Sequence, residues 1–146
     1  MAEKKSVLMK WYLRYHALYK KGHNRRANFL YRLCMLLFNC SIPPSAEIDE
    51  SVNFGHPIGI VIHQNSVVGK NTLIYQNVTL GRIGLDNQDA PVIGDNCVIG
   101  AGACILGKIH IGDNVKIGAN AVVTKDIPDN CTAVGVPAKV IHKNGE

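Results

Sequence analysis

Apolar residues recur every six positions through most of this chain. Neither an α-helix, with about 3.6 residues per turn, nor a β-strand, with alternating side chains, produces such a spacing. A unit of six carries one inward side chain and its own turn, so the period predicts a β-solenoid whose short strands stack about 4.8 Å apart. The residues at this spacing form three runs: Ile42, Ile48, Phe54 and Ile60; Ile62, Val68, Ile74 and Leu80; and Ile93, Ile99, Ile105, Ile111, Ile117 and Val123.

Three units of six close one triangular coil, so residues eighteen apart should lie in columns along a prism. About four or five such coils fit in residues 42–128. The end coils need covers, because repeats bury apolar surface only against their neighbours. We therefore expect three parts: an N-terminal helical arm at residues 1–40, the solenoid at residues 41–128 with a protruding loop at residues 82–92, and a C-terminal cap at residues 129–146.

Positive charge is concentrated in the arm. Residues 1–40 hold nine Lys and Arg against one Glu, a net charge of +8, whereas the rest of the chain holds seven against ten. The apolar residues of the arm follow helical spacing, and Gly22 separates two expected helices. We expect these helices to cover the first coil and to help subunits associate. A basic amphipathic arm can also rest on an anionic membrane surface, but packing against the solenoid explains the same pattern and is favoured.

Other classes of protein are disfavoured. The apolar run at residues 29–38 contains Arg32 and is far shorter than the roughly 20 residues of a transmembrane helix. No signal-peptide pattern is found, so we expect a cytoplasmic protein. Nucleic-acid binding is not expected, because the arm lacks a recognisable motif. The cysteines are odd in number and lack CxxC spacing, which argues against a disulfide framework and a structural zinc site. They are Cys34, Cys40, Cys97, Cys104 and Cys131.

Four segments occur in the order seen in the hexapeptide-repeat acyltransferases. They are residues 54–62, 76–81, 99–103 and 135–139. The last, Gly-Val-Pro-Ala-Lys, is a rather specific signature, and the chain resembles the serine acetyltransferase branch of that family over roughly residues 41–142. The resemblance implies a mainly β protein with a left-handed parallel β-helix, a homotrimer, and transfer of an acetyl group from acetyl-CoA to a hydroxyl group.

His56 is the candidate catalytic residue. In the family a histidine in the matching stretch acts as general base toward the acceptor hydroxyl. An alcohol is a poor nucleophile at neutral pH, and an imidazole is well suited to take its proton as the oxygen attacks the thioester. Without the resemblance, the favoured interpretation of His56 would be an ordinary polar residue in an outward turn.

The chain departs from the serine acetyltransferase pattern at three places. Ser41 and Gly55 each stand where the pattern has an aspartate, and Ala90 replaces a second histidine. In the family these groups are associated with holding a charged amino-acid acceptor. Their loss favours a neutral acceptor, so we expect the hydroxyl of a sugar in a polysaccharide or glycan precursor, with L-serine of cysteine biosynthesis as the alternative.

A strip of small residues indicates where acetyl-CoA binds. Alanines eighteen apart, preceded by glycines eighteen apart, should line one column and leave a groove for an extended pantetheine arm. The turns themselves explain the pattern equally well, because the tight turn of every six-residue unit favours small residues whether or not a ligand binds there. The residues that we assign to acetyl-CoA are Gly81, Gly100, Ala101 and Ala119, with Arg82, Lys125 and Lys139 as partners of its phosphates.

The column count also bears on assembly. Counting back through residues 82–92 puts His56 in the column of Gln76, Asp95 and Asp113, away from the alanines. A threefold assembly would then bring the histidine of one chain to the groove of its neighbour. We expect the loop at residues 82–92 to arch over the site.

Two other classes of function stay open. A metal-dependent hydratase of the carbonic anhydrase type is one, because some left-handed β-helix proteins bind zinc through histidines, and His56, His63 and His110 are available. Their spacing does not converge as a three-histidine site requires, so no metal is expected. A non-catalytic assembly module is the other.

Overall fold

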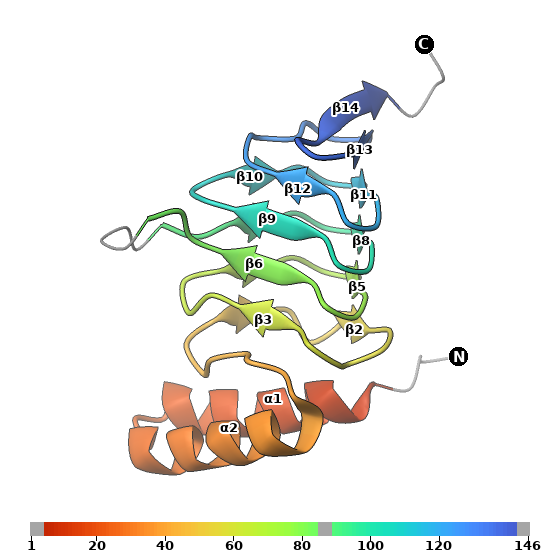
Figure 1. Ribbon diagram of the computed structural model, residues 1–146. Helices are drawn as coiled ribbons and strands as arrows, with labels where there is room; N and C mark the ends of the chain where they lie inside the picture. Colours follow the sequence, from red (N-terminus) through yellow and green to blue (C-terminus); the bar gives the residue numbers. More distant parts are fainter. Residues whose placement is uncertain (1–4, 85–88, 143–146) are drawn as a thin grey trace.

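The computed structural model describes residues 5–84 and 89–142, and it shows two helices followed by a stack of triangular coils (Figure 1). Helix α1 spans Val7–Lys20 and helix α2 spans Asn24–Phe38. Short strands then follow one another around three sheets, and the strands of the coils pair in parallel with the strands one coil away. A final antiparallel pair, β13 with β14, ends the stack.

The strands fall into three sheets, which we number in chain order. Sheet 1 contains β1 (Glu47–Ile48), β4 (Val67–Val68), β7 (Val92–Ile93) and β10 (His110–Ile111). Sheet 2 contains β2 (Asn53–Phe54), β5 (Leu73–Ile74), β8 (Val98–Ile99), β11 (Lys116–Ile117), β13 (Cys131–Val134) and β14 (Lys139–His142). Sheet 3 contains β3 (Val61–Ile62), β6 (Thr79–Gly81), β9 (Cys104–Leu106) and β12 (Val122–Val123). The turn after the strands of each sheet is called corner 1, corner 2 or corner 3.

The residues at the six-residue spacing fill the interior of the prism. None is more than 6% exposed. Paired strands keep them in register, with Ile93 beside Ile111 in sheet 1 and Ile99 beside Ile117 in sheet 2. The predicted solenoid, with columns of residues eighteen apart, is confirmed in these coils.

Aspartate and asparagine side chains join successive coils at corner 1. Asp95 Oδ1 accepts a hydrogen bond from the Lys70 backbone N–H at 2.7 Å. Asp113 and Asp129 accept in the same way, also at 2.7 Å, from the residue one coil earlier. The next residue of each turn is an asparagine with positive φ, a conformation that asparagine tolerates better than most residues. These asparagines are Asn71, Asn96, Asn114 and Asn130.

Corner 2 of the first coil is longer than the six-residue count predicts. Phe54 pairs with Ile74, twenty residues later, so the coil contains two extra residues. The prediction that Ile60 continues the first run is therefore wrong in register. Ile62 takes the inward position of β3, and Ile60 is buried two residues before it.

A second insertion leaves the prism at corner 3, after β6. Val68 pairs with Ile93, twenty-five residues later, so this coil carries seven extra residues. They belong to the protruding loop expected at residues 82–92, of which residues 85–88 lie outside the described part of the chain. Near the returning end of the loop, Asp89 Oδ1 lies 3.8 Å from Lys108 Nζ.

Helices α1 and α2 cover the open end of the first coil (Figure 1). The Tyr12 hydroxyl donates to the Ala46 carbonyl at 2.7 Å and accepts from the Ile48 N–H at 3.1 Å. The Tyr15 hydroxyl donates to the Ile42 carbonyl at 2.9 Å. These buried hydroxyls satisfy backbone groups of a coil that has no neighbour on this side.

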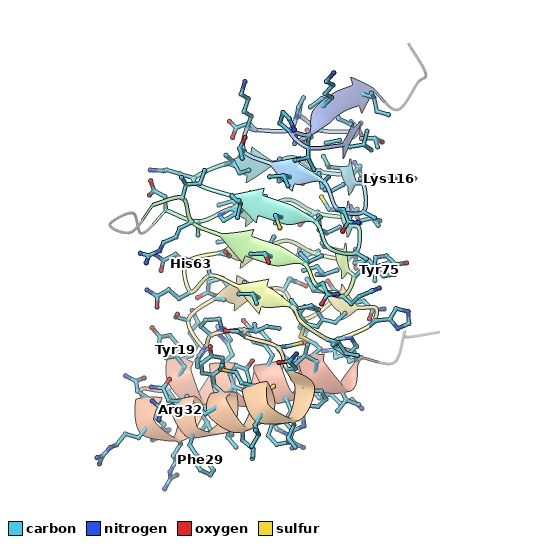
Figure 2. All side chains as sticks on the ribbon, viewed as in Figure 1. Tyr19, Phe29, Arg32, His63, Tyr75 and Lys116 are labelled. Atoms are coloured by element: carbon cyan, nitrogen blue, oxygen red, sulfur yellow. The ribbon has the colours of Figure 1, made fainter. Side chains whose placement is uncertain are left out.

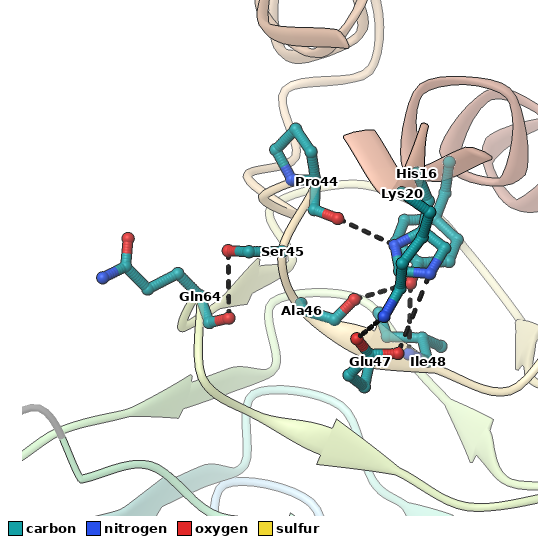
Figure 3. Close-up of polar contacts among 9 residues, drawn as sticks. His16, Lys20, Pro44, Ser45, Ala46, Glu47, Ile48 and Gln64 are labelled. Atoms are coloured by element: carbon teal, nitrogen blue, oxygen red, sulfur yellow. Dashed lines mark hydrogen bonds and ion pairs between the residues drawn. The ribbon is translucent and has the colours of Figure 1, made fainter. Parts of the chain in front are cut away.

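Polar contacts continue along α1 (Figure 3). His16 Nδ1 lies 2.7 Å from the Pro44 carbonyl oxygen, and Lys20 Nζ forms an ion pair with the Glu47 carboxylate. The helices thus cover the first coil as the sequence predicted, whereas their role in subunit association stays a prediction. None of the described helices is long and apolar enough to cross a bilayer.

Replacing Tyr12 with phenylalanine should lower the free energy of unfolding by about 1–2 kcal/mol. The side chain is fully buried, and the variant would leave the Ala46 carbonyl and the Ile48 N–H without this partner. Chemical denaturation measures the change. Tyr19→Phe is the matched control, because Tyr19 is 38% exposed, and it should change stability by less than about 0.5 kcal/mol. Equal losses in the two variants would contradict this role of Tyr12.

Candidate active site

His56 lies on a bulge at corner 2. In the second coil Gln76 alone fills this corner position, whereas residues 56–58 share it in the first coil. The equivalence follows from the backbone: the Ile58 carbonyl accepts a hydrogen bond from the Asn77 N–H at 2.9 Å, and the Gln76 carbonyl accepts one from the next coil, also at 2.9 Å. Two residues are therefore extra, and the first of them is His56, whose side chain is exposed.

Tyr75 forms a wall beside His56. The two ring centroids are 6.4 Å apart and the ring planes are inclined by 36°. Gly55 makes room for the tyrosine, since a Cβ at that position would lie 3.2 Å from ring atoms of Tyr75. Sequence reasoning missed Tyr75. The available signal was the distance of eight residues, instead of six, between the inward residues Phe54 and Ile62.

The position of His56 relative to the alanine strip corrects the sequence prediction. Strands β2, β5, β8 and β11 pair within sheet 2, so the residues that follow them share corner 2. His56, Ala101 and Ala119 therefore lie along the same corner of one chain. Asp95 and Asp113 follow strands of sheet 1 instead. The predicted separation of His56 from the alanines is wrong, because the insertion after β6 adds seven residues and not a whole number of six-residue units.

The residues assigned to acetyl-CoA divide between two corners. At corner 2, or in the sheet 2 strand β14 beyond it, lie Gly100, Ala101, Ala119 and Lys139. After the strands of sheet 3, at β6 and corner 3, lie Gly81, Arg82 and Lys125. Figure 2 shows the two regions at opposite edges of the prism, with Tyr75 on one side and His63 on the other. One chain alone does not bring the second group to His56.

Stacking of the coils accounts for Gly100 without a ligand. A Cβ on Gly100 would lie 2.6 Å from the backbone nitrogen of Ala119 and 2.8 Å from the Ile117 carbonyl oxygen. This supports the explanation that the tight turn alone, without a ligand, requires the glycine. Ala119 is exposed, so the alanines leave the outside of corner 2 open beside the bulge.

An open hollow of about 350 Å³ lies at corner 3, with Ile62 and Leu80 in its lining. His63, which sequence reasoning considered only as a metal ligand, forms part of its wall together with Arg82. His63 Nδ1 accepts a hydrogen bond from the Asn65 N–H at 3.2 Å, so the neutral ring carries its proton on Nε2. Partial burial, and then the positive charge of Arg82, lower the pKa of His63.

Replacing His63 with glutamine should make stability less sensitive to acid. Since the pKa of His63 is lower in the folded protein than in the unfolded chain, the unfolded chain takes up the proton first as the pH falls below about 6.5. The free energy of unfolding then decreases as the pH falls from about 6.5 toward the lower, folded-state pKa. Denaturation midpoints at pH 7.5 and at about pH 5.5 should differ less in His63→Gln than in the native sequence. A difference of the same size in both proteins would contradict this contribution.

The three histidines considered for a hydratase lie in different columns. His56 is at corner 2, His63 is at corner 3 and His110 is in β10 of sheet 1. Within residues 5–84 and 89–142, no group of three or more His, Cys, Asp or Glu side chains is placed to hold a metal ion. A single chain therefore does not assemble these histidines into one site.

Comparison with known proteins identifies the class of this fold. Residues 90–125 match the family model described as bacterial transferase hexapeptide (six repeats). The fold and this match define a hexapeptide-repeat transferase. A serine acetyltransferase of Helicobacter pylori is 42% identical over 130 residues, which cover 88% of this chain and 76% of that protein. The chain belongs to the serine acetyltransferase-like branch of the hexapeptide-repeat acyltransferase family.

The chain is shorter than these relatives. A serine acetyltransferase of Synechococcus elongatus is 41% identical over 131 residues, but the match covers only 54% of its length. Solved structures agree in fold: a serine acetyltransferase in complex with CoA has a TM-score of 0.85, and the soybean enzyme complexed with serine has 0.88. Each is 37% identical to this chain, and each match covers 92% of this chain. The match covers 55% of the chain in the CoA complex and 56% of the soybean chain. This likeness confirms the left-handed parallel β-helix.

Proposed function

We propose that the chain is an acetyl-CoA-dependent O-acetyltransferase with His56 as general base. The observation that carries the proposal is the exposed histidine on the corner 2 bulge, in a chain whose relatives are serine acetyltransferases. A similar structure contains CoA, the product that remains when acetyl-CoA has donated its acetyl group, and this supports acetyl-CoA as the donor. The alanines at 101 and 119 leave the part of corner 2 after β8 and β11 without bulky side chains, as an extended pantetheine arm requires.

The reaction needs one proton acceptor and one polarised carbonyl. His56 takes the proton from the acceptor hydroxyl while the hydroxyl oxygen forms a bond to the acetyl carbon. Main-chain N–H groups stabilise the negative charge that develops on the carbonyl oxygen. The C–S bond then breaks, and the proton held by His56 passes to the departing CoA thiolate. The products are the O-acetyl ester and CoA.

A neighbouring chain completes the site in this proposal. His56 protrudes at corner 2, whereas Gly81, Arg82 and Lys125 lie on the opposite side of the same chain. In the threefold assembly that we propose, corner 2 of one chain faces sheet 3 and corner 3 of the next. The outward residues of sheet 3 support this contact, because none is charged and one is 45% exposed. They are Val61, Thr79, Gly81, Cys104, Leu106 and Val122.

L-Serine is the first candidate acceptor. Relatives of about 40% identity are serine acetyltransferases, and a similar structure is described as complexed with serine. The comparisons thus favour the acceptor that sequence reasoning gave as the alternative, over the sugar hydroxyl that it preferred.

A sugar hydroxyl is the second candidate, and the surroundings of His56 support it. Gly55 faces the Tyr75 ring and supplies no carboxylate beside the histidine. Ser41, which stands where the family has an aspartate, does not lie beside His56: it pairs with Val61 of sheet 3, and its hydroxyl bonds to the Tyr31 hydroxyl at 2.8 Å. The ammonium group of an amino acid would find fewer carboxylates here than the family pattern provides.

A panel of acceptors decides between the two candidates. Acetyl-CoA is offered with L-serine and, separately, with nucleotide-linked and lipid-linked sugars, and release of CoA is followed. We expect turnover of L-serine with kcat/KM of at least about 10⁴ M⁻¹s⁻¹. Turnover of a sugar alone at this efficiency would select the second candidate. Absence of turnover with every acceptor, in folded protein that binds CoA, would count against the enzymatic proposal.

A further inference from the structure

The two N-terminal helices turn a basic and apolar face away from the coils. On α1 the side that contacts the first coil carries Tyr12 and Tyr15. Helical geometry places residues three, four and seven apart on one side. The side of α1 opposite the coil therefore carries Lys10 and Arg14, with Lys21 just beyond the end of the helix.

Helix α2 continues this face. Its inner side carries the buried Ala27 and Cys34 and the Tyr31 hydroxyl that bonds to the first coil. Its opposite side carries Arg25, Phe29, Arg32 and Leu36. These four residues, together with Lys10 and Arg14 of α1 and Lys21 just beyond its end, are called the outer face.

The outer face combines large exposed apolar groups with an excess of positive charge. Phe29 is 67% exposed and Leu36 is 81% exposed, and Figure 2 shows Phe29 pointing away from the coils. Residues 5–40 contain no Asp or Glu. The ion pairs found in the described part of this arm use Lys5, His16 and Lys20, and none of them uses a cation of the outer face.

We propose that the outer face binds the surface of an anionic membrane, with both helices lying flat and Phe29 and Leu36 inserted between the lipids. Basic residues beside exposed apolar side chains are typical of helices that lie in a membrane interface. Anionic headgroups attract each lysine or arginine near the surface. A second copy of this chain is a poor occupant, because its outer face would bring the same five cations against these five.

The arrangement of the fold fits a flat surface. The helices lie across the end of the stack, so no coil projects beyond them on that side (Figure 1). In a threefold assembly of side-by-side prisms, three outer faces would point the same way and bind together with higher avidity. Membrane binding by the outer face does not depend on acetyl transfer.

Co-sedimentation with unilamellar vesicles tests the proposal. The full chain should bind vesicles of equal parts phosphatidylglycerol and phosphatidylcholine, bind pure phosphatidylcholine vesicles far more weakly, and dissociate as salt is raised. Arg25→Gln/Arg32→Gln should lower the partition coefficient about 25-fold, since each cation near such a surface contributes about fivefold. Phe29→Ser/Leu36→Ser should also lower it, although the net charge is unchanged.

A matched control removes the same charge elsewhere. Lys70→Gln/Lys116→Gln alters two exposed lysines on the coils, and it should bind vesicles like the native sequence. Circular dichroism confirms that each variant is folded. The proposal would be overturned if Arg25→Gln/Arg32→Gln and Lys70→Gln/Lys116→Gln lost binding equally, or if the native sequence did not bind vesicles at low salt. It would also be overturned if copies of the chain associated with one another as concentration rises and Phe29→Ser/Leu36→Ser abolished that association.

Discussion

Replacing His56 with asparagine should lower kcat for acetyl transfer by about 10²–10⁴-fold. Asparagine is polar and of similar size, so the bulge and the wall formed by Tyr75 should persist, but its amide does not accept a proton at neutral pH. KM for acetyl-CoA should change little, because His56 acts on the acceptor. Release of CoA under saturating acetyl-CoA measures the effect. His110→Asn, an exposed histidine of sheet 1, is the matched control and should retain full activity.

Mixed assemblies separate this role from an ordinary structural role. Chains carrying His56→Asn lack the base at corner 2, and chains carrying Arg82→Glu are altered at corner 3. If each site joins corner 2 of one chain to corner 3 of the next, random mixing of equal amounts should restore about a quarter of the native activity. His56→Asn chains mixed with Ala119→Trp chains should stay inactive, because both changes lie at corner 2.

The two mixtures give opposite results under the alternative arrangement. Recovery with Ala119→Trp chains but not with Arg82→Glu chains would mean that the base of one chain serves the alanine strip of another. Retention of full kcat by His56→Asn itself would remove the histidine from the mechanism. Mass spectrometry of the mixed sample verifies that chains have exchanged.

The regular part of the fold could be predicted because one rule repeats. Each inward residue, such as Ile99 or Ile117, is followed by a turn of fixed length, so counting in sixes reproduces the register of the sheets. The cover over the first coil also follows from the sequence, since an end coil without a neighbour requires one. In such a stack, the six-residue spacing along the sequence is enough to predict which residues of neighbouring coils lie side by side.

The site could not be predicted in full, because it lies where the count breaks. The bulge with His56 and the insertion after β6 each shift the register by an amount that is not a multiple of six. A continuous count therefore groups His56 correctly with Gln76 but wrongly with Asp95 and Asp113, and it gives Ile60 the wrong position. The neighbour of the histidine, Tyr75, belongs to the next coil, and only the pairing of β2 with β5 places it there.

Replacing Gly94 with alanine should lower the free energy of unfolding by about 3 kcal/mol. A Cβ at Gly94 would lie 2.7 Å from the carbonyl carbon and oxygen of Gly112, in the coil directly beside it. Neither atom can give way easily, because the backbone N–H groups that donate to Asp113 and its equivalents at corner 1 hold the coils at a fixed spacing. Gly94 therefore reports how tightly corner 1 is stacked.

Gly81→Ala is the matched control, since Gly81 follows the inward residue Leu80 in sheet 3 as Gly94 follows Ile93 in sheet 1. Its Cβ would meet only flexible side-chain atoms, at 3.1 Å in Leu106 and 3.5 Å in Thr79. Rotation of these groups should keep the loss below about 1 kcal/mol. Guanidinium denaturation of the two variants measures the difference. Similar losses would mean that corner 3 is as tightly stacked as corner 1.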